Sequence, residues 1–244
     1  MNLQLTSIII PTFNGLPLLK ACVTSIRQHT SVPYEIIVVD NGSGDGTSTY
    51  CRNENIKFVA LPANLGFPAA CNYGLLFAEG DSLMLLNNDT IVTPNWLPML
   101  LNCLYSREEV GMVGPVSNYV NGKQKIRVPF TGISNMAHIY NHVNPRKWRE
   151  TKRLVGFCLL FKRKLVEQVG VLDERFAPGY YEDDDFSYRA RLAGYQLLIA
   201  GDCFVYHRGS VSFRKNSRRS KLLLLRRNRK KFIHKWGVDP FQFI

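Results

Sequence analysis

The chain has 244 residues and a formal net charge of +12, from 31 Lys and Arg against 19 Asp and Glu. Twelve of the basic residues and one acidic residue lie between positions 206 and 244, so residues 1–205 are nearly neutral. This distribution excludes a uniformly basic nucleic-acid coat protein and indicates a neutral body with a basic tail. Hydrophobic residues make up 45% of the chain, which predicts a sizeable core rather than general disorder.

Targeting and redox signals are weak. The apolar runs are far shorter than the roughly 18–20 residues that span a bilayer. The start, MNLQLTSIII, has no basic region before its apolar run, so we expect no cleaved signal peptide. The cysteines form no CxxC pair and stand among apolar residues, which predicts buried thiols in a reducing, cytoplasmic compartment. They are Cys22, Cys51, Cys71, Cys103, Cys158 and Cys203.

The first 90 residues alternate between short apolar runs and segments of helical length. Runs that are apolar throughout are typical of a parallel sheet covered on both faces. The predicted fold is therefore α/β, with a doubly wound, mostly parallel sheet. Strands are predicted at 7–11, 35–40, 56–61 and 82–87, and helices at 16–29 and at 68–80, the second ending at a glycine.

Polar clusters follow three of these strands, at 11–14, 40–43 and 87–89. Ligands of open α/β sheets bind outside the carboxyl ends of the strands, so the clusters predict a binding site at one sheet edge. Each cluster alone is also compatible with an ordinary turn. Residues 120–153 show little periodicity and are predicted to form a long loop, and 154–170 to form a strand and a helix.

Four consecutive carboxylates, Glu182 to Asp185, precede a segment with helical spacing. They could simply complement the helix dipole, but that explains one or two acids and not four that repel one another. A general base whose pKa is tuned by such neighbours is the alternative.

Asp89 and His207 each follow an apolar run. Each could be structural, as a turn residue or a core histidine. Together they could also bind Mg²⁺ or Mn²⁺, with phosphate oxygens and water as the other ligands. The chain lacks GxGxxG, GxxxxGK[ST], HExxH and GxSxG, which removes the common dehydrogenase, NTPase, zinc-protease and hydrolase readings.

Seven motifs follow one another along the chain: SIIIPTFNG, EIIVVDNGSGDGT, NLGFPAACNYG, LLNNDT, LVGFCLLFKR, FAPGYYEDDDFSYRARLAGY and VYHRGS. In this order and spacing they resemble the inverting family 2 glycosyltransferases with a GT-A fold. The resemblance extends over residues 6–212 and is greatest to bacterial rhamnosyltransferases and cell-surface polysaccharide glycosyltransferases. It implies a GT-A domain at 1–212, with a nucleotide-sugar-binding half at 1–114 and an acceptor half at 115–212, followed by a basic amphipathic tail at 213–244.

The resemblance also implies residue roles. Asp183 corresponds to the catalytic base, supported by Glu182, Asp185 and Gly156, and Asp89 and His207 correspond to the ligands of a divalent metal, Mn²⁺ or Mg²⁺. Asn41 replaces an Asp found in many members, and Asn87 replaces the first Asp of the metal-binding motif, which predicts a weaker metal affinity. The nucleotide-sugar site is implied at Pro11, Thr12, Asn14, Asp40, Asn41, Asn64, Gly66, Asn88 and Asp89.

The implied reaction transfers a hexosyl or rhamnosyl group from a UDP- or dTDP-sugar to a glycan or lipid-linked acceptor, with inversion, in cell-surface polysaccharide synthesis. Two alternatives stay open: a non-catalytic nucleotide- or nucleic-acid-binding module, and a nucleotidyltransferase on the same fold. The tail lacks the motifs of sequence-specific binders, so we expect no nucleic-acid partner. Its rough apolar stripe predicts either packing on its own domain or peripheral binding to the anionic inner face of the membrane.

Overall fold

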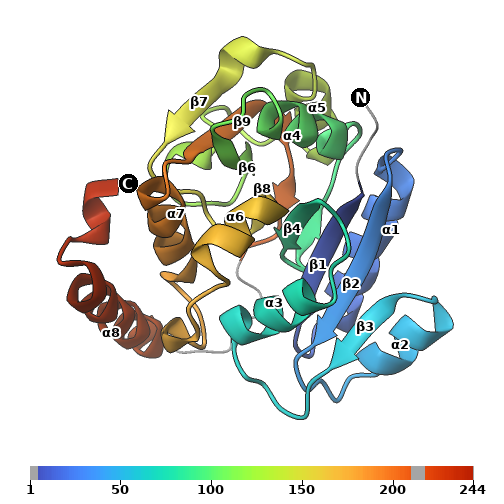
Figure 1. Cartoon of the computed structure of the whole chain (residues 1–244). Helices are drawn as coiled ribbons and strands as arrows, with labels where there is room; N and C mark the ends of the chain where they lie inside the picture. The colour runs from blue at the N-terminus through green and yellow to red at the C-terminus, as the bar shows by residue number, and fades with distance from the viewer. Residues whose placement is uncertain (1–4, 210–217, 244) are drawn as a thin grey trace.

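The computed structural model describes residues 5–209 and 218–243. One eight-stranded sheet crosses the molecule in the order β3-β2-β1-β4-β8-β6-β9-β7 (Figure 1). β5 and β10 form a second, two-stranded sheet. The strands are β1 (Thr6–Thr12), β2 (Tyr34–Asp40), β3 (Lys57–Ala60), β4 (Ser82–Leu86), β5 (Thr90–Ile91), β6 (Val110–Val116), β7 (Trp148–Thr151), β8 (Cys158–Lys162), β9 (Gln196–Phe204) and β10 (Tyr206–His207).

The large sheet is mostly parallel, as the sequence predicts. β1 pairs in parallel with β2 and β4, β2 with β3, and β6 with β9. β8 runs antiparallel between β4 and β6, and the edge strand β7 runs antiparallel to β9. The carboxyl ends of β1, β2, β4, β6 and β9 therefore lie along one edge of the sheet.

Helices cover both faces of this sheet, which is why the strands are apolar at successive positions. Ile8 and Ile10 pack with α1 and α4, whereas Ile9 packs on the opposite face with α3. The helices are α1 (Leu16–His29), α2 (Thr47–Asn53), α3 (Phe67–Leu76), α4 (Trp96–Leu104), α5 (Ile133–Tyr140), α6 (Arg163–Val169), α7 (Glu182–Leu192) and α8 (Arg218–Trp236), and the 3₁₀ turns are η1 (Gly122–Gln124), η2 (Pro145–Lys147), η3 (Glu174–Phe176) and η5 (Pro240–Phe243).

Two local predictions were wrong. Helix α3 ends at Leu76 and not at Gly80; a side chain at Gly80 would meet the Leu5 carbonyl oxygen at 2.5 Å, so this glycine permits a close backbone approach instead of ending a helix. The predicted loop at 120–153 contains α5 and β7. β7 is a strand because β9, nearly 50 residues later, pairs with it, and a local pattern does not record such a partner.

All six cysteines are buried and free, as expected. Within 5–209 and 218–243, no helix combines the length and apolarity needed to cross a bilayer. The division at residue 114 stays a prediction, and the strands on its two sides share one sheet.

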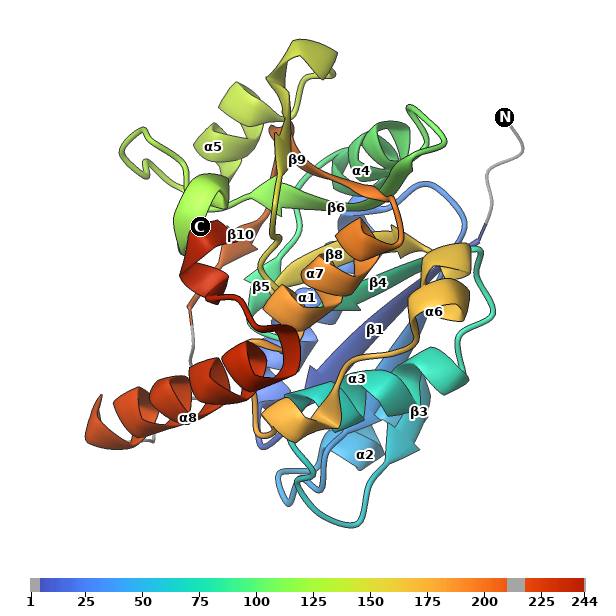
Figure 2. The same cartoon turned by 60° about the vertical axis from the view of Figure 1, so that its left-hand side comes forward.

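Helix α8 packs against the rest of the domain, beside the segment that leads into α7 (Figure 2). Phe232 is fully buried in an aromatic cluster with Phe176, Tyr181 and Phe243. The side of α8 that carries Leu225, Phe232 and Trp236 therefore faces the domain, whereas Leu222 and Leu223 are exposed. Positions 213–217 and 244 of the predicted tail lie outside the described residues.

Candidate functional site

The three polar clusters predicted from the sequence meet at the carboxyl edge of the sheet. Thr12 and Asp40 are register partners at the ends of β1 and β2. Asn88, just beyond β4, donates a 2.7 Å hydrogen bond from Nδ2 to Thr12 Oγ1. A side chain at Gly15 would lie 2.7 Å from that Nδ2, so Gly15 leaves space for this contact.

The turn after β2 is built around Asp40. Its two carboxylate oxygens accept hydrogen bonds from the Ser43 amide at 2.9 Å and the Ser48 hydroxyl at 2.6 Å. Asn14, at φ 47°, joins the same turn by accepting from the Gly44 amide and donating its own amide to Ser43 Oγ. Pro11 is buried in β1 and contributes to the strand end.

Asn41 organises the neighbouring loop at 64–66. Its Oδ1 accepts the Leu65 amide at 2.9 Å, and its Nδ2 donates to Asn64 Oδ1 and to the Gly66 carbonyl oxygen. A nucleobase hydrogen bond to Asn41 would therefore use the second lone pair of an oxygen that is already engaged.

Gly66 connects this loop to the segment that precedes the acid cluster. It has φ +92°, and a Cβ there would lie 3.0 Å from Pro178 Cα, so a larger residue would be both strained and crowded. The next residue, Phe67, donates its amide to the Pro178 carbonyl oxygen at 2.9 Å. The predicted nucleotide loop and the segment leading to the predicted base are thus in direct contact.

The small β5–β10 sheet brings Asp89 and His207 together across 118 residues of sequence. His207 Nε2 lies 3.1 Å from Asp89 Oδ1, and both side chains are buried. The imidazole stacks on Phe157 at 5.1 Å between ring centroids, and its Nδ1 lies 2.7 Å from the Tyr119 carbonyl oxygen.

This geometry suits a divalent cation. A carbonyl oxygen only accepts, so Nδ1 of His207 carries hydrogen, and Nε2 faces the carboxylate of Asp89. A carboxylate next to an imidazole nitrogen is a ligand pair that suits Mn²⁺ or Mg²⁺. Among the described residues, no third His, Cys, Asp or Glu completes a cluster, so the remaining ligands would come from a substrate or water.

The acid cluster begins α7, as predicted. Asp183 Oδ2 accepts the Gly156 amide at 2.9 Å, and its Oδ1 accepts the Asp184 amide at 3.0 Å. Two backbone donors therefore orient this carboxylate, and it is the one member of the cluster that neither pairs with a cation nor lacks a partner at a buried oxygen.

The neighbours of Asp183 are electrostatically costly. Burial, and next the charge of Asp183, raise the pKa of Glu182 well above its ordinary value, and Glu182 Oε2 is buried without a hydrogen-bond partner. Burial and Asp183 also raise the pKa of Asp184 to about 7, although Arg153 lies 3.0 Å away and opposes the shift. That ion pair lacks hydrogen-bond geometry, so its attraction only partly offsets burial.

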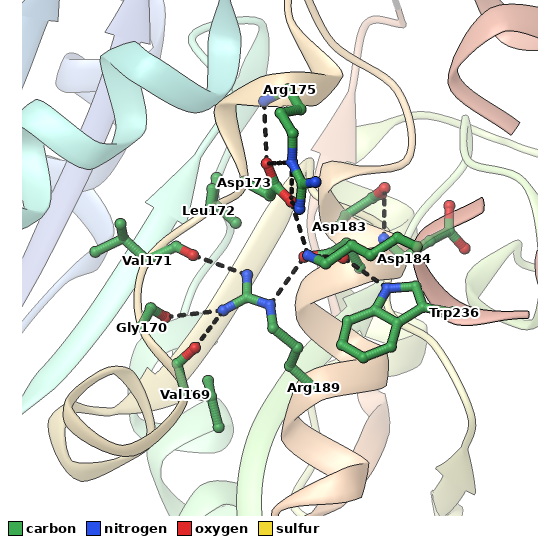
Figure 3. Close-up of polar contacts among 12 residues, drawn as sticks. Val169, Gly170, Val171, Leu172, Asp173, Arg175, Asp183, Asp184, Arg189 and Trp236 are labelled. Atoms are coloured by element: carbon green, nitrogen blue, oxygen red, sulfur yellow. Dashed lines mark hydrogen bonds and ion pairs between the residues drawn. The ribbon is translucent and has the colours of Figure 1, made fainter. Parts of the chain in front are cut away.

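Asp185 differs from the other three acids because it is completely buried among cationic and N–H donors. Figure 3 shows two of these donors, Arg189 and Trp236. Its oxygens accept from Arg189 Nε at 2.8 Å, Lys235 Nζ at 2.6 Å and Trp236 Nε1 at 2.8 Å. Arg189 also donates to the carbonyl oxygens of Val169, Gly170 and Val171. Asp185 therefore attaches the start of α7 to α8.

Several residues of the site were missed in the sequence. Tyr119 acts through its carbonyl oxygen, which leaves no side-chain signal. Arg153 lies in the predicted loop, and the buried Asn228 of α8 lies in the tail. The unusual presence of a polar amide between basic helix residues could have marked Asn228, and nothing local marks the other two.

Comparisons with known proteins agree with this architecture. Residues 7–170 match the model described as Glycosyl transferase family 2. An N-acetylglucosaminyl-diphospho-decaprenol L-rhamnosyltransferase of Mycobacterium tuberculosis is 26% identical, over 82% of this chain and 75% of the relative. An uncharacterized protein of Sinorhizobium fredii is 28% identical, over 97% of this chain. The chain spans only 28% of that second relative's length.

A solved structure shows the same fold. The mannosyltransferase PcManGT of Pyrobaculum calidifontis, in complex with GDP-Man and Mn²⁺, aligns with a TM-score of 0.65 at 21% identity. The alignment covers 84% of this chain and 56% of that one, and it confirms the expected GT-A fold. Because the family model matches well over half of its residues, the chain belongs to glycosyl transferase family 2.

Proposed function

We propose that the chain is an inverting glycosyltransferase that moves a sugar from a nucleoside diphosphate to a hydroxyl group of a glycan or lipid-linked acceptor. The observation that carries this proposal is the Asp183 carboxylate, oriented by the Gly156 and Asp184 amides and joined through the 176–181 segment to the nucleotide loop at Gly66. A single displacement requires the base and the donor to be held in a fixed relative position, and this connection supports that arrangement.

In this reaction Asp183 accepts the proton of the acceptor hydroxyl. The hydroxyl oxygen forms a bond to the anomeric carbon from the face opposite the nucleotide, and the bond from that carbon to the diphosphate oxygen breaks. The electron pair leaves with the nucleoside diphosphate, and the anomeric configuration inverts.

The donor is proposed to be a UDP- or dTDP-sugar held at the carboxyl edge of the sheet. Thr12 Oγ1 accepts from Asn88 and keeps its own hydrogen to donate to a ligand. Asp40, Asn14, Asn41 and Asn64 hold the two turns between which the nucleotide would lie. In this proposal they act mainly by shaping the backbone, because their side-chain groups already bind one another.

The proposed metal ligands are Asp89 and His207. A divalent ion there supplies positive charge beside the departing diphosphate. The presence of Mn²⁺ in the structure of the Pyrobaculum mannosyltransferase supports this assignment. We expect EDTA to abolish transfer and Mn²⁺ or Mg²⁺ to restore it, and His207→Ala to weaken Mn²⁺ binding in a calorimetric titration. Full transfer in chelator, or unchanged Mn²⁺ affinity in the variant, would reject the assignment.

Product analysis tests the function as a whole. The protein is incubated with UDP-, dTDP- and GDP-sugars, with glucose, rhamnose, mannose and N-acetylglucosamine among the sugars, and the released nucleotide is identified. A nucleoside diphosphate supports glycosyl transfer, whereas pyrophosphate release would instead identify a nucleotidyltransferase. The relative from Mycobacterium tuberculosis makes a diphosphate-linked polyprenol the first acceptor to include, and a hexosyl or rhamnosyl group the first sugar to score.

We propose further that α8 holds the enzyme at the anionic inner face of the cytoplasmic membrane. Its outer face carries Leu222 and Leu223, which are 49% and 58% exposed, beside the exposed Arg226 and Lys230. A hollow of about 430 Å³ continues this basic face; it is lined by Arg175, Phe176, Lys230, Lys231, His234 and Lys235. Exposed leucines next to cations are typical of a helix lying at a lipid surface.

Charge reversal tests this location without removing the helix. Arg226→Glu with Lys230→Glu leaves the buried side of α8 unchanged, and we expect it to abolish flotation with vesicles that contain phosphatidylglycerol. Wild-type protein should float with these vesicles and not with pure phosphatidylcholine. Equal flotation of wild type and the double variant would reject the proposal.

A further inference from the structure

Asn228 occupies an unusual position in α8. It is completely buried, near the middle of a helix whose other residues are mainly basic and aliphatic. Asn is a poor helix former, and burying an amide costs free energy unless each polar atom is paired. Phe232, one turn later, provides a separate apolar contact between α8 and the domain.

The side chain of Asn228 binds the segment immediately before the acid cluster. Its Nδ2 donates to the carbonyl oxygens of Phe176 at 2.7 Å, Gly179 at 2.9 Å and Tyr180 at 3.1 Å. Three carbonyl groups of one short segment thus point at a single amide that lies about 50 residues later in the chain.

That segment has a strained backbone. Tyr180 and Tyr181 have φ values of 71° and 77°, a region that residues with a Cβ rarely adopt. A residue in this region is strained and persists only where surrounding contacts hold it. Asp183 follows two residues after Tyr181, so the conformation of these tyrosines determines where the carboxylate of Asp183 stands.

A second attachment lies just beyond Asp183. Lys235 and Trp236, two turns after Asn228 on α8, donate to Asp185. Lys235 also pairs with Asp173 at 2.7 Å, whose pKa is lowered by hydrogen bonds from Arg175 and Lys235 despite its burial. Helix α8 therefore contacts the chain on both sides of Asp183.

We propose that α8 positions the catalytic carboxylate, with Asn228, Lys235 and Trp236 as positioning residues. Asn228 holds the strained segment before Asp183, and Lys235 and Trp236 hold Asp185 after it. The inference rests on the proposed role of Asp183 as the base. It gives the C-terminal helix a function in turnover that is separate from binding to a membrane.

Two variants test this proposal. Asn228→Leu keeps a similar side-chain volume and removes the donor, and Trp236→Phe keeps the aromatic packing and removes the N–H group that binds Asp185. A displaced base costs turnover and not donor affinity, so we expect each to lower kcat by about tenfold or more and to leave the donor Kd within about twofold. Asn102→Leu, the same change at an exposed position of α4, is the matched control and should keep the wild-type kcat.

Hydrogen exchange gives a readout that does not depend on activity. In Asn228→Leu the backbone amides of residues 176–185 should exchange faster, while those of β1 and β4 should keep wild-type protection. Wild-type kcat in both variants, or a fall in kcat accompanied by equal losses of donor affinity and of protection throughout the sheet, would overturn the proposal.

The same experiments separate this inference from the proposed function. If Asp183→Asn abolishes transfer while Asn228→Leu and Trp236→Phe turn over normally, the function stands and the positioning role fails. If the wild-type protein transfers no sugar, the function fails, and unchanged exchange at 176–185 in Asn228→Leu would then reject the positioning role on its own.

Discussion

Polar groups are buried in opposite ways at the carboxyl edge of the sheet, where the donor is proposed to bind, and in the acid cluster of α7. We call the first region the donor edge. At the donor edge, neutral amides and hydroxyls pair with one another around Asn41 and Thr12. In the acid cluster, like charges are adjacent, Glu182 keeps an oxygen without a partner, and Asp185 depends on two residues of the C-terminal helix. Residues at the sheet edge hold the first region, whereas the second also depends on contacts from α8.

The two regions therefore differ in the electrostatic cost of burying their polar groups. A paired network of neutral groups rigidifies a binding site at little electrostatic cost. Crowded carboxylates raise one another's pKa values, which is useful for proton transfer and unfavourable for stability. Mutations at the donor edge should therefore affect mainly binding, and mutations around the acids should affect turnover and stability.

The largest expected effect is at the base. Asp183→Asn keeps the shape of the side chain and its acceptor for the Gly156 amide but cannot take a proton. We expect kcat to fall by about 10²- to 10⁴-fold, the range for loss of a general base, with the donor Kd nearly unchanged. Steady-state kinetics and donor titration measure the two quantities, and near-normal turnover would remove Asp183 from this role.

The next prediction concerns the packing of α8, which supports the acid cluster. Phe232→Ala empties the aromatic cluster under α8 and should lower the free energy of unfolding by about 3–5 kcal/mol. Leu223→Ala, on the exposed side of the same helix, should change it by less than about 0.5 kcal/mol. Urea unfolding followed by circular dichroism measures both, and equal stabilities of the two variants would show that α8 contributes little to the fold.

A smaller effect is expected at the donor edge. Asn41→Ala removes the hydrogen bonds to Leu65, Asn64 and Gly66, and we expect donor binding to weaken by about 1–3 kcal/mol because the loop loses its organiser. Turnover at saturating donor should stay close to wild type. A loss confined to kcat would contradict the division between binding edge and catalytic cluster.

The last prediction is a pH dependence of stability. Because burial raises the pKa of Asp184 from 3.8 to about 7, the folded state binds a proton that the unfolded state has released between these values. The contribution of Asp184 to stability is therefore full below about pH 4 and is lost as the pH rises toward 7, with a slope of at most about 1.4 kcal/mol per pH unit.

Asp184→Asn removes this titration. The free energy of unfolding of the variant, minus that of the wild type, should increase from pH 4 to pH 7 and stay level above about pH 7. Chemical unfolding at several pH values measures the difference. A difference that is constant across this window would mean that Asp184 titrates normally in the folded protein.

Much of the fold could be predicted from the sequence because its signals are local. The apolar runs at β1, β2 and β4 and the turn residues after them mark buried strands and one polar edge. The order of the motifs also indicated the family. The start of α7 at Glu182 was likewise predicted, since acids before a helical pattern are a local signal.

The tertiary structure decided what distant segments do to one another. The pairing of His207 with Asp89 depends on the β5–β10 ladder, and the strand β7 exists only because β9 accepts it. The four acids look alike in the sequence, yet their environments differ. Backbone amides orient Asp183, and Asp184 pairs with Arg153. Glu182 keeps an oxygen without a partner, and α8 binds Asp185.

The basic tail is the clearest example of a property that the sequence alone leaves undecided. Its composition alone established a concentration of positive charge and a rough apolar stripe between positions 206 and 244. Only the folded molecule determined that Phe232 and Trp236 face the domain while Leu222 is exposed. It also determined that Asn228 and Lys235 reach the segment around Asp183. Charge is a property that residues carry individually, whereas burial and hydrogen bonding depend on which groups the fold brings within a few ångströms.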